Sequence, residues 1–402
     1  MCVQTRCGWV VLLAAACALL QLGVAGAAEL EMNEAVTYAH AGVLLAVPKD
    51  FDDRRPTEES EVMRAVRTVT GKPVQAVSLG AYCIGSKDSA EDFADAMEQN
   101  LAANLAVRKF KVLKKTPITI AGISGSARLL KYTFRGEATT AARAFFVRRL
   151  KTDDVSICYV LTVEAVAQHD DMLLPVLDRV IKTVKLTAVQ HPVLLPVRLS
   201  VKPVRDERLG FAVRPPISWY VRSTPMGISM GQTDYLTGGW PSPLVTVAVA
   251  EVAEGAKSKA CLKKAIQPYL AAAREGGPSV DILSHEVTKM GGNPAHQVMI
   301  RLTPKGSPAT RPGKEPPAPD ARQAPGKAAQ LRILRVICVA ADKDRPFRSY
   351  AMIMVCRTAE MKAVRAAMDT IAGGFEVLSS TAPDTRPADK KAAKKDAKKA
   401  AK

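Results

Sequence analysis

Residues 42–51 read Gly-Val-Leu-Leu-Ala-Val-Pro-Lys-Asp-Phe, an apolar strand pattern that ends in a proline and an aromatic residue. The pattern returns 168 positions later at residues 210–219, which read Gly-Phe-Ala-Val-Arg-Pro-Pro-Ile-Ser-Trp. A glycine, an aliphatic residue, a proline and an aromatic residue stand at the same places in both stretches. This repeat predicts that the chain contains two copies of one fold.

The match extends over residues 41–186, with shifts that grow from 168 to 170 and then to 191. The last increase means that the second copy holds 21 extra residues. They fall in residues 303–330, a stretch rich in Pro, Gly, Lys and Arg with almost no large apolar residue. Matching pairs along the two copies include Gly122 and Gly292, Tyr159 and Tyr350, Asp178 and Asp369, and Val184 and Phe375.

The composition, 48% hydrophobic and 24% charged residues, is that of a globular protein. Two units of about 150 to 170 residues fit the usual size of a domain. We therefore expect a signal peptide at residues 1–27, a first domain at 37–188, a Pro-rich linker at 189–205, a second domain at 206–379 with the insert at 303–330, and a disordered Lys/Ala-rich tail at 380–402.

The first 27 residues have the features of a secretory signal peptide. Arg6 supplies positive charge, residues 10–22 form an apolar run, and Ala25-Gly26-Ala27 is a small-residue cleavage pattern. The run is shorter than the roughly 20 residues that span a bilayer. We expect an exported protein, periplasmic, secreted or envelope-associated, with no transmembrane span in the mature chain. A lipid anchor on Cys17 is the alternative.

Cysteine usage predicts a fold that does not depend on disulfides. Five cysteines remain after the signal peptide, an odd number, so at least one thiol is free. None forms a C-x-x-C pair and most lie in apolar runs, where a cysteine packs as a small hydrophobic side chain. These residues are Cys83, Cys158, Cys261, Cys338 and Cys356.

Each copy reads as a sheet with helices, an α+β pattern. Ser89 is expected to cap an amphipathic helix that carries Phe93, Met97 and Leu101, and its counterpart carries Leu262, Ile266 and Leu270. A hairpin over residues 144–163, repeated at 332–355, precedes a closing helix in each copy. Six strands are predicted in the first copy, at residues 42–48, 62–69, 74–84, 127–134, 142–150 and 155–163.

This order of elements resembles the PsbP-like superfamily, which includes PsbP, LpqN and DcrB types. The resemblance rests on the strand at residues 43–51, the Gly-led strand at 121–127, and the long hairpin with Tyr159 before the last helix. It covers both copies. It implies a tandem antiparallel sheet flanked by helices, exported in many members and mostly without catalysis, and it contributes no catalytic residues.

One partial enzyme motif is present. Gly227-Ile228-Ser229-Met230-Gly231 fits the G-x-S-x-G pattern, which needs a strand before the serine and a helix after it. No helix pattern follows, so a hydrolase that uses Ser229 with His285 or His296 is the less favoured alternative. No zinc-protease, clustered Cys/His or phosphate-loop motif occurs in the sequence, so we predict no catalytic residue, metal or cofactor.

Charge is the remaining indication of function. The chain carries a formal net charge of +18, of which the last 14 residues hold +5. A flexible polycation such as this tail can attach to anionic lipids or acidic envelope polymers, and a solubilising tail with no specific partner is the alternative. We expect an exported, non-enzymatic interaction or scaffold protein of the cell envelope, attached peripherally to a polyanion, with an unknown protein partner and no specific nucleic acid. A periplasmic protein that binds a small ligand between sheet and helix is an alternative. The predicted polyanion-binding residues are Lys390, Lys391, Lys394, Lys395, Lys398, Lys399 and Lys402.

Overall fold

The computed structural model describes residues 30–150, 155–192, 195–237, 240–305, 330–339, 347–357 and 360–378. The predicted signal peptide with Cys17 and the predicted tail lie outside the described residues, as does most of the insert. The chain divides into two compact units, residues 1–54 with 62–189 and residues 55–61 with 190–402.

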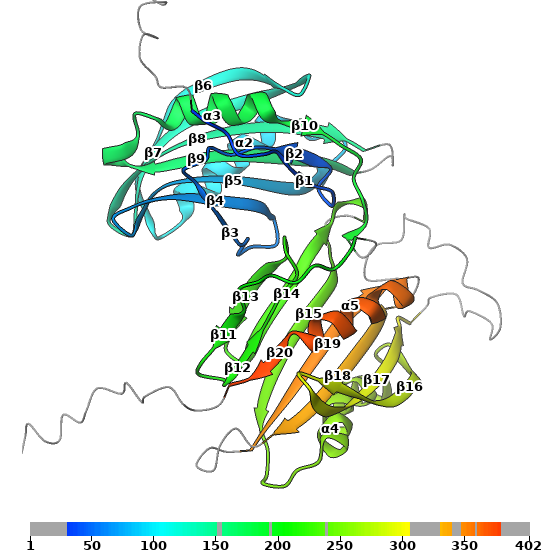
Figure 1. Cartoon of the computed structure of the whole chain (residues 1–402). Helices are drawn as coiled ribbons and strands as arrows, with labels where there is room; N and C mark the ends of the chain where they lie inside the picture. The colour runs from blue at the N-terminus through cyan, green and yellow to red at the C-terminus, as the bar shows by residue number, and fades with distance from the viewer. Residues whose placement is uncertain are drawn as a thin grey trace, which may run out of the picture. The chain divides into compact units, whose positions relative to one another are not determined.

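The first unit is built on an antiparallel sheet with the strand order β3-β4-β5-β9-β8-β7-β6 (Figure 1). Consecutive strands β6 to β9 are neighbours joined by hairpins, and β9 also pairs with β5. The strands are β3 (Asp52–Arg54), β4 (Glu61–Val69), β5 (Lys72–Gly85), β6 (Val107–Ile120), β7 (Ile123–Phe134), β8 (Glu137–Arg149) and β9 (Val155–Val166).

Two helices cover opposite faces of this sheet. Successive residues of a strand point to opposite sides, so neighbouring residues of one strand pack against different helices. Phe145 of β8 packs against α2 (Ala90–Ala103), whereas Phe146 stacks on Tyr159 of β9, on the face that α3 (Leu173–Thr183) covers. A small sheet of β1 (Val36–Tyr38), β2 (Val43–Leu45) and β10 (Lys185–Leu186) adjoins α3, and a short helix η2 (Ala167–His169) precedes it. As predicted, Ser89 caps α2, in a reciprocal capping box with Asp92.

The second unit repeats this plan. Its sheet has the order β13-β14-β15-β19-β18-β17-β16, and its small sheet the order β11-β12-β20. The elements are β11 (Val204–Asp206), β12 (Phe211–Val213), β13 (Tyr220–Thr224), β14 (Gly227–Asp234), η4 (Tyr235–Thr237), β15 (Trp240–Glu251), α4 (Ser258–Arg274), β16 (Ser279–Met290), β17 (Asn293–Thr303), β18 (Gln330–Val339), β19 (Arg348–Arg357), α5 (Met361–Gly373) and β20 (Phe375–Val377).

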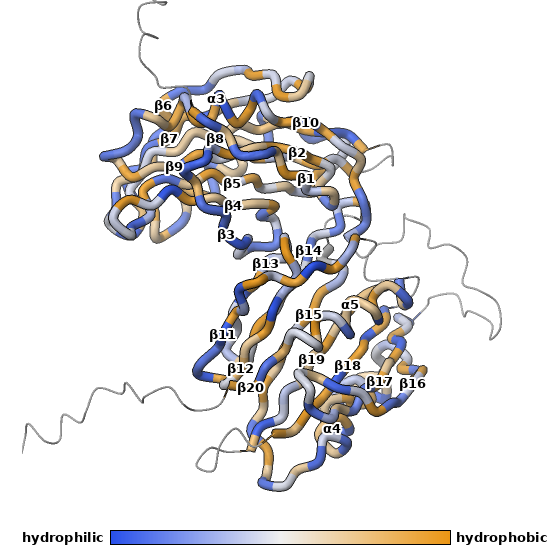
Figure 2. The backbone as a smooth tube through the Cα atoms, in the orientation of Figure 1, coloured by the Kyte–Doolittle hydropathy of each residue, from blue (hydrophilic) through white to orange (hydrophobic). Residues whose placement is uncertain are grey.

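The core of the second unit also has two parts, one on each face of its sheet, because successive side chains of a strand point to opposite faces. Figure 2 shows hydrophobic and hydrophilic residues alternating along the tube. On β18, Ile333 and Ile337 pack with α5, and Leu334 and Val336 pack with α4. Each helix therefore buries one apolar stripe against one face of the sheet.

The backbone confirms the duplication in register. Leu44 pairs with Lys185 in the first small sheet, and Ala212 pairs with Glu376 in the second, which are the positions that the shifts of 168 and 191 predict. The glycines that lead into these strands, Gly42 and Gly210, have φ angles of 62° and 72°, a conformation that side chains disfavour. The tandem α+β fold predicted from the sequence is confirmed.

One part of the predicted strand pattern is wrong. Strands β6 and β16, of 14 and 12 residues, were not among the predicted strands. Both are edge strands, mostly exposed, and their bulges shift the alternation of polar and apolar residues. In the described part of the chain, no helix is long and apolar enough to cross a membrane.

Candidate functional site

Ser229 does not occupy a nucleophile elbow. It lies within β14, paired with Arg222 on one side and Thr246 on the other, and the strand continues to Asp234. His285 and His296 lie on β16 and β17. Because three strands separate β14 from β17, at about 4.8 Å for each step, roughly 19 Å divides the two strands. The structure therefore does not bring Ser229 together with either histidine.

The two histidines instead stack on each other. Their ring centroids are 5.6 Å apart and the rings are nearly parallel, at 8°. Partial burial, and next the neighbouring His285, hold the pKa of His296 below its usual value. Within the described ranges, no group of three or more His, Cys, Asp or Glu side chains is placed to hold a metal ion.

A histidine–carboxylate pair that the sequence did not suggest lies elsewhere in the second unit. His191 Nδ1 is 3.0 Å from Oδ2 of Asp234, and the buried Asp234 carboxylate also accepts a hydrogen bond from the backbone N–H of Leu236. Ser229 is five residues along the extended strand from Asp234, roughly 17 Å at about 3.4 Å per residue. The pair therefore holds the predicted linker against the end of β14 and does not complete a Ser229 triad.

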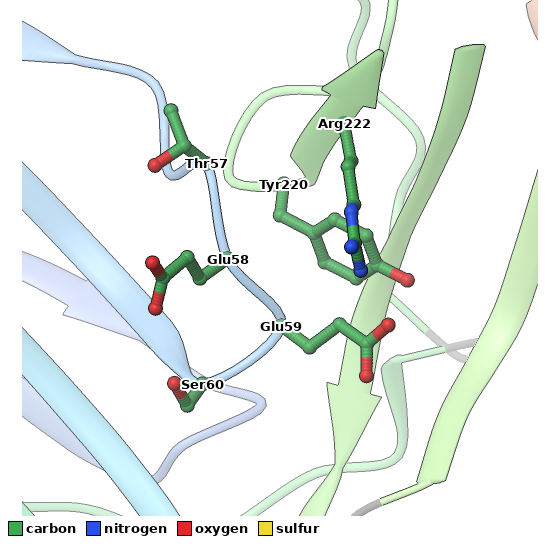
Figure 3. Close-up of a pocket in the computed structure, with 6 residues that line it drawn as sticks. All are labelled: Thr57, Glu58, Glu59, Ser60, Tyr220 and Arg222. Carbon is green, nitrogen blue, oxygen red and sulfur yellow. The ribbon is translucent and has the colours of Figure 1, made fainter. Parts of the chain in front are cut away.

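A pocket of about 660 Å³ lies between the segment at residues 57–60 and β13, within the second unit (Figure 3). Glu59 points toward Tyr220 and Arg222, whereas Glu58 points away from them (Figure 3). Burial, and next the charge of Glu59, raise the pKa of the Tyr220 hydroxyl. The small-ligand alternative predicted a groove between sheet and helix, and this pocket lies on a sheet edge instead.

The most distinctive surface of the described chain is the free edge of the first sheet, formed by β6 and the adjoining part of β7. Residues 108–115 of β6 contain five Lys or Arg residues in eight positions. Lys115 faces α2, where its Nζ lies 2.7 Å from Asp95 and 3.5 Å from Glu98. The other cations are exposed. We call the following set the basic edge: Leu105, Arg108, Lys109, Lys111, Lys114, Lys131, Phe134 and Arg135.

Two bulges in β6 arrange these side chains. One lies between Arg108 and Lys111, where Lys109 has a φ of 55°, and the other lies between Val112 and Lys114. Phe110 and Val112 still pack into the core beneath α2. Arg108, Lys111 and Lys114 are therefore on the opposite face of β6, and Lys131 of β7 is paired directly with Lys111.

The cations of the basic edge are not neutralised within the described residues. None of the six lies within 4.0 Å of a carboxylate oxygen there. Like charges on paired strand positions repel each other, so Lys111 and Lys131 are a local source of positive potential.

Two exposed apolar side chains lie at one end of the basic edge. Leu105, which is 85% exposed, stands in the turn before β6, where the Asn104 side chain accepts a hydrogen bond from the backbone of Ala106. Phe134 is 39% exposed at the end of β7, and the Arg135 guanidinium lies over its ring at 5.3 Å. The backbone N–H of Arg135 donates to the carbonyl of Ala106, so the two apolar side chains lie at the same end of the hairpin.

Two buried arginines, by contrast, are satisfied inside the protein. Arg128 of β7 donates to Glu98 at 2.7 Å and also contacts Glu91 and Ser126. Arg335 of β18 donates to Gln297 at 2.8 Å and contacts Asp369 of α5. These groups fasten helices to sheets and offer no charge to a ligand.

Comparison of the sequence with protein-family models and with curated proteins gives no match. Comparison with solved structures gives several. The cyanobacterial PsbP (CyanoP) of Synechocystis sp. PCC 6803 is 11% identical with a TM-score of 0.31, and the match covers 46% of this chain and 95% of that one. LpqN, involved in cell envelope biogenesis of Mycobacterium tuberculosis, is 13% identical with a TM-score of 0.32, over 40% of this chain and 92% of that one.

A third structure is matched over most of the chain. The immunity protein TplEi of the T6SS from Pseudomonas aeruginosa is 11% identical with a TM-score of 0.24, over 87% of this chain and 99% of that one. The first two structures are of the PsbP and LpqN types that the sequence resembles. The similarity concerns the fold alone.

Proposed function

We propose that the chain is an exported, non-enzymatic interaction protein of the cell envelope, which attaches to an anionic lipid surface through the basic edge. One observation carries the proposal. Six cations without a carboxylate neighbour among the described residues lie on the same sheet edge as the exposed side chains of Leu105 and Phe134. Cations near a charged membrane contribute about 1 kcal/mol each. Apolar side chains beside them add burial in the lipid interface.

The lysine-rich tail supports the same function from the sequence. Its seven lysines add a second polycation, and two weak attachments on one chain bind more tightly than either alone. A soluble acidic polymer attracts the same cations and gains little from Leu105. The apolar contribution therefore favours a lipid surface over an envelope polymer.

The lysines and bulges of β6 also have a structural role, because both features prevent an exposed edge strand from pairing with another chain. The two roles differ in their consequences. If edge protection is the whole role, neutral substitutions promote self-association and leave lipid binding unchanged. If the proposal holds, they weaken lipid binding in the monomer.

The test is co-sedimentation of the full mature chain with vesicles of phosphatidylglycerol and phosphatidylcholine, beside binding to polyphosphate. We expect binding to the anionic vesicles, none to pure phosphatidylcholine, and several-fold weaker vesicle binding by Leu105→Ser with polyphosphate binding unchanged. Leu174→Ser, at another exposed leucine of the same unit, is the matched control. Equal vesicle binding by Leu105→Ser and wild type would instead indicate a polymer partner.

A further inference from the structure

Two cysteines of the second unit lie in direct contact. The Sγ atoms of Cys261 on α4 and Cys338 on β18 are 2.8 Å apart, although the residues are 77 positions apart in the sequence. Both are free thiols. A disulfide bond is about 2.05 Å long, so the sulfur atoms need to approach by less than about 1 Å to form one.

The surroundings hold this contact in place. Cys261 is 7% exposed and packs with Leu262, Val336 and other residues of the core beneath α4. The backbone N–H of Cys338 donates a 3.1 Å hydrogen bond to the hydroxyl of Ser258, in the first turn of α4. The helix is therefore fastened to the strand beside the two thiols.

We infer that Cys261 and Cys338 form a disulfide that ties α4 to β18 when the protein meets an oxidising thiol–disulfide environment. This inference is independent of the proposed attachment to lipid. The disulfide would be a modification of a fold that does not need it. The other three cysteines lie elsewhere in the structure. Cys83 and Cys158 are in the first unit, and Cys356 is buried in the α5 side of the second core.

The reaction is a pair of thiol–disulfide exchanges with an external disulfide, such as oxidised glutathione, as the oxidant. Cys338, the more exposed thiol, loses its proton and attacks one sulfur of that disulfide, which releases one thiolate and leaves a mixed disulfide. Cys261 then loses its proton and attacks Sγ of Cys338, which forms the internal bond and releases the second thiolate. Two protein thiols are oxidised, one external disulfide is reduced, and the two protons pass to the released thiolates.

The first exchange is expected to be slow. Burial, and next the neighbouring Cys261, raise the pKa of Cys338 to about 12, so little thiolate is present at neutral pH. The incubation with oxidant therefore has to be long.

The test is mass spectrometry of the full mature chain after incubation with oxidised glutathione, with remaining thiols alkylated before digestion. We expect one internal crosslink between the peptides that contain Cys261 and Cys338, and alkylation at the other three cysteines. Dithiothreitol reverses the crosslink. The same chain held in dithiothreitol throughout gives five alkylated cysteines.

Three single variants test which cysteines form the crosslink. Cys261→Ser and Cys338→Ser each abolish the crosslink, and Cys83→Ser, at a partly exposed cysteine of the first unit, leaves it intact. If a variant does not fold, the crosslink map of the wild-type chain decides alone. No crosslink, stable glutathione adducts in its place, or a crosslink to another cysteine overturns the inference.

Discussion

The hydroxyl of Tyr159 donates a 2.6 Å hydrogen bond to the backbone carbonyl of Ala41, the residue before Gly42. In the second copy the hydroxyl of Tyr350 donates a 3.2 Å hydrogen bond to the carbonyl of Leu209, the residue before Gly210. The tyrosines match at the shift of 191 and the carbonyls at the shift of 168. A tyrosine of the long hairpin therefore fixes the glycine turn in each copy.

Removing this hydroxyl is expected to destabilise the unit that contains it. Tyr159→Phe leaves the buried carbonyl of Ala41 without its donor, at a cost of about 1–2 kcal/mol in the free energy of unfolding. Urea unfolding followed by circular dichroism measures the change. Tyr82→Phe, at a half-buried tyrosine of the same sheet, is the control and is expected to stay within about 0.5 kcal/mol of wild type. Equal stability of Tyr159→Phe and wild type would show that the bond is dispensable.

The ion cluster around Arg128 is expected to stabilise the contact between α2 and the sheet. Arg128→Met removes the closer of two cations from the nearly buried Glu98 and leaves it only Lys115, at 3.5 Å. The free energy of unfolding is expected to fall by about 3 kcal/mol, the lower end of the cost of breaking a buried pair. Lys182→Met breaks the exposed pair with Asp178 and is expected to cost less than about 1 kcal/mol. A similar, small loss in both variants would contradict a special role for Arg128.

The same cluster predicts loss of stability in acid. The hydrogen bond from Ser126, with Arg128 beside it, lowers the pKa of Glu91, and the hydrogen bond from Lys115 lowers the pKa of Asp95. Because these folded-state pKa values lie below the unfolded ones, the stabilisation is present above about pH 4.5 and is lost as the pH falls through the lowered values. Thermal unfolding between pH 3 and pH 6 measures this. In the double variant Glu91→Gln, Asp95→Asn, the unfolding temperature is expected to fall less steeply as the pH is lowered. An equally steep fall in the variant and wild type would assign the loss to other carboxylates.

Local sequence patterns made several features predictable. These are the duplication, the two helices of each copy and the central strands. Ser89 is followed by apolar residues at helical spacing, and the strand that contains Tyr159 is a continuous apolar run. Such signals survive in a single sequence because each element buries one stripe or one face.

Strand β6 was not predictable in the same way, although it carries the candidate site. Lysines are depleted in strands, and its bulges at Lys109 and Leu113 break the alternation that would have marked it. Its partner β7 imposes the extended conformation. The sequence therefore drew attention to the basic tail, and the basic edge emerged only when the strand pairing was known.

The contact between Cys261 and Cys338 was also beyond the sequence. The two cysteines are far apart along the chain and have no equivalents in the first copy. Only the packing of α4 across β18 brings them together. Patterns of spacing between cysteines do not reveal such pairs.

Oxidation of this pair is expected to raise the stability of the second unit. A bond that closes a loop of 77 residues stabilises by at most about 4.5 kcal/mol in the chain-entropy model, and native disulfides typically contribute about 2–4 kcal/mol. Tryptophan fluorescence follows the unfolding of this unit, since Trp219 and Trp240 both belong to it. The unfolding midpoint of the oxidised chain should exceed that of the reduced chain by several degrees. Cys338→Ser should show no such difference, and a difference that persists in this variant would contradict the account.

The most direct test of the account is the dissociation constant for phosphatidylglycerol vesicles at low salt, measured with residues 28–402. The triple variant Lys109→Gln, Lys111→Gln, Lys114→Gln removes three charges from the basic edge, and Lys259→Gln, Lys263→Gln, Lys264→Gln removes three from the exposed side of α4. At about 1 kcal/mol for each lysine, the first variant is predicted to bind about 100-fold more weakly, and the second less than about threefold. Equal losses in the two variants, or no loss in the first, would contradict attachment through the basic edge.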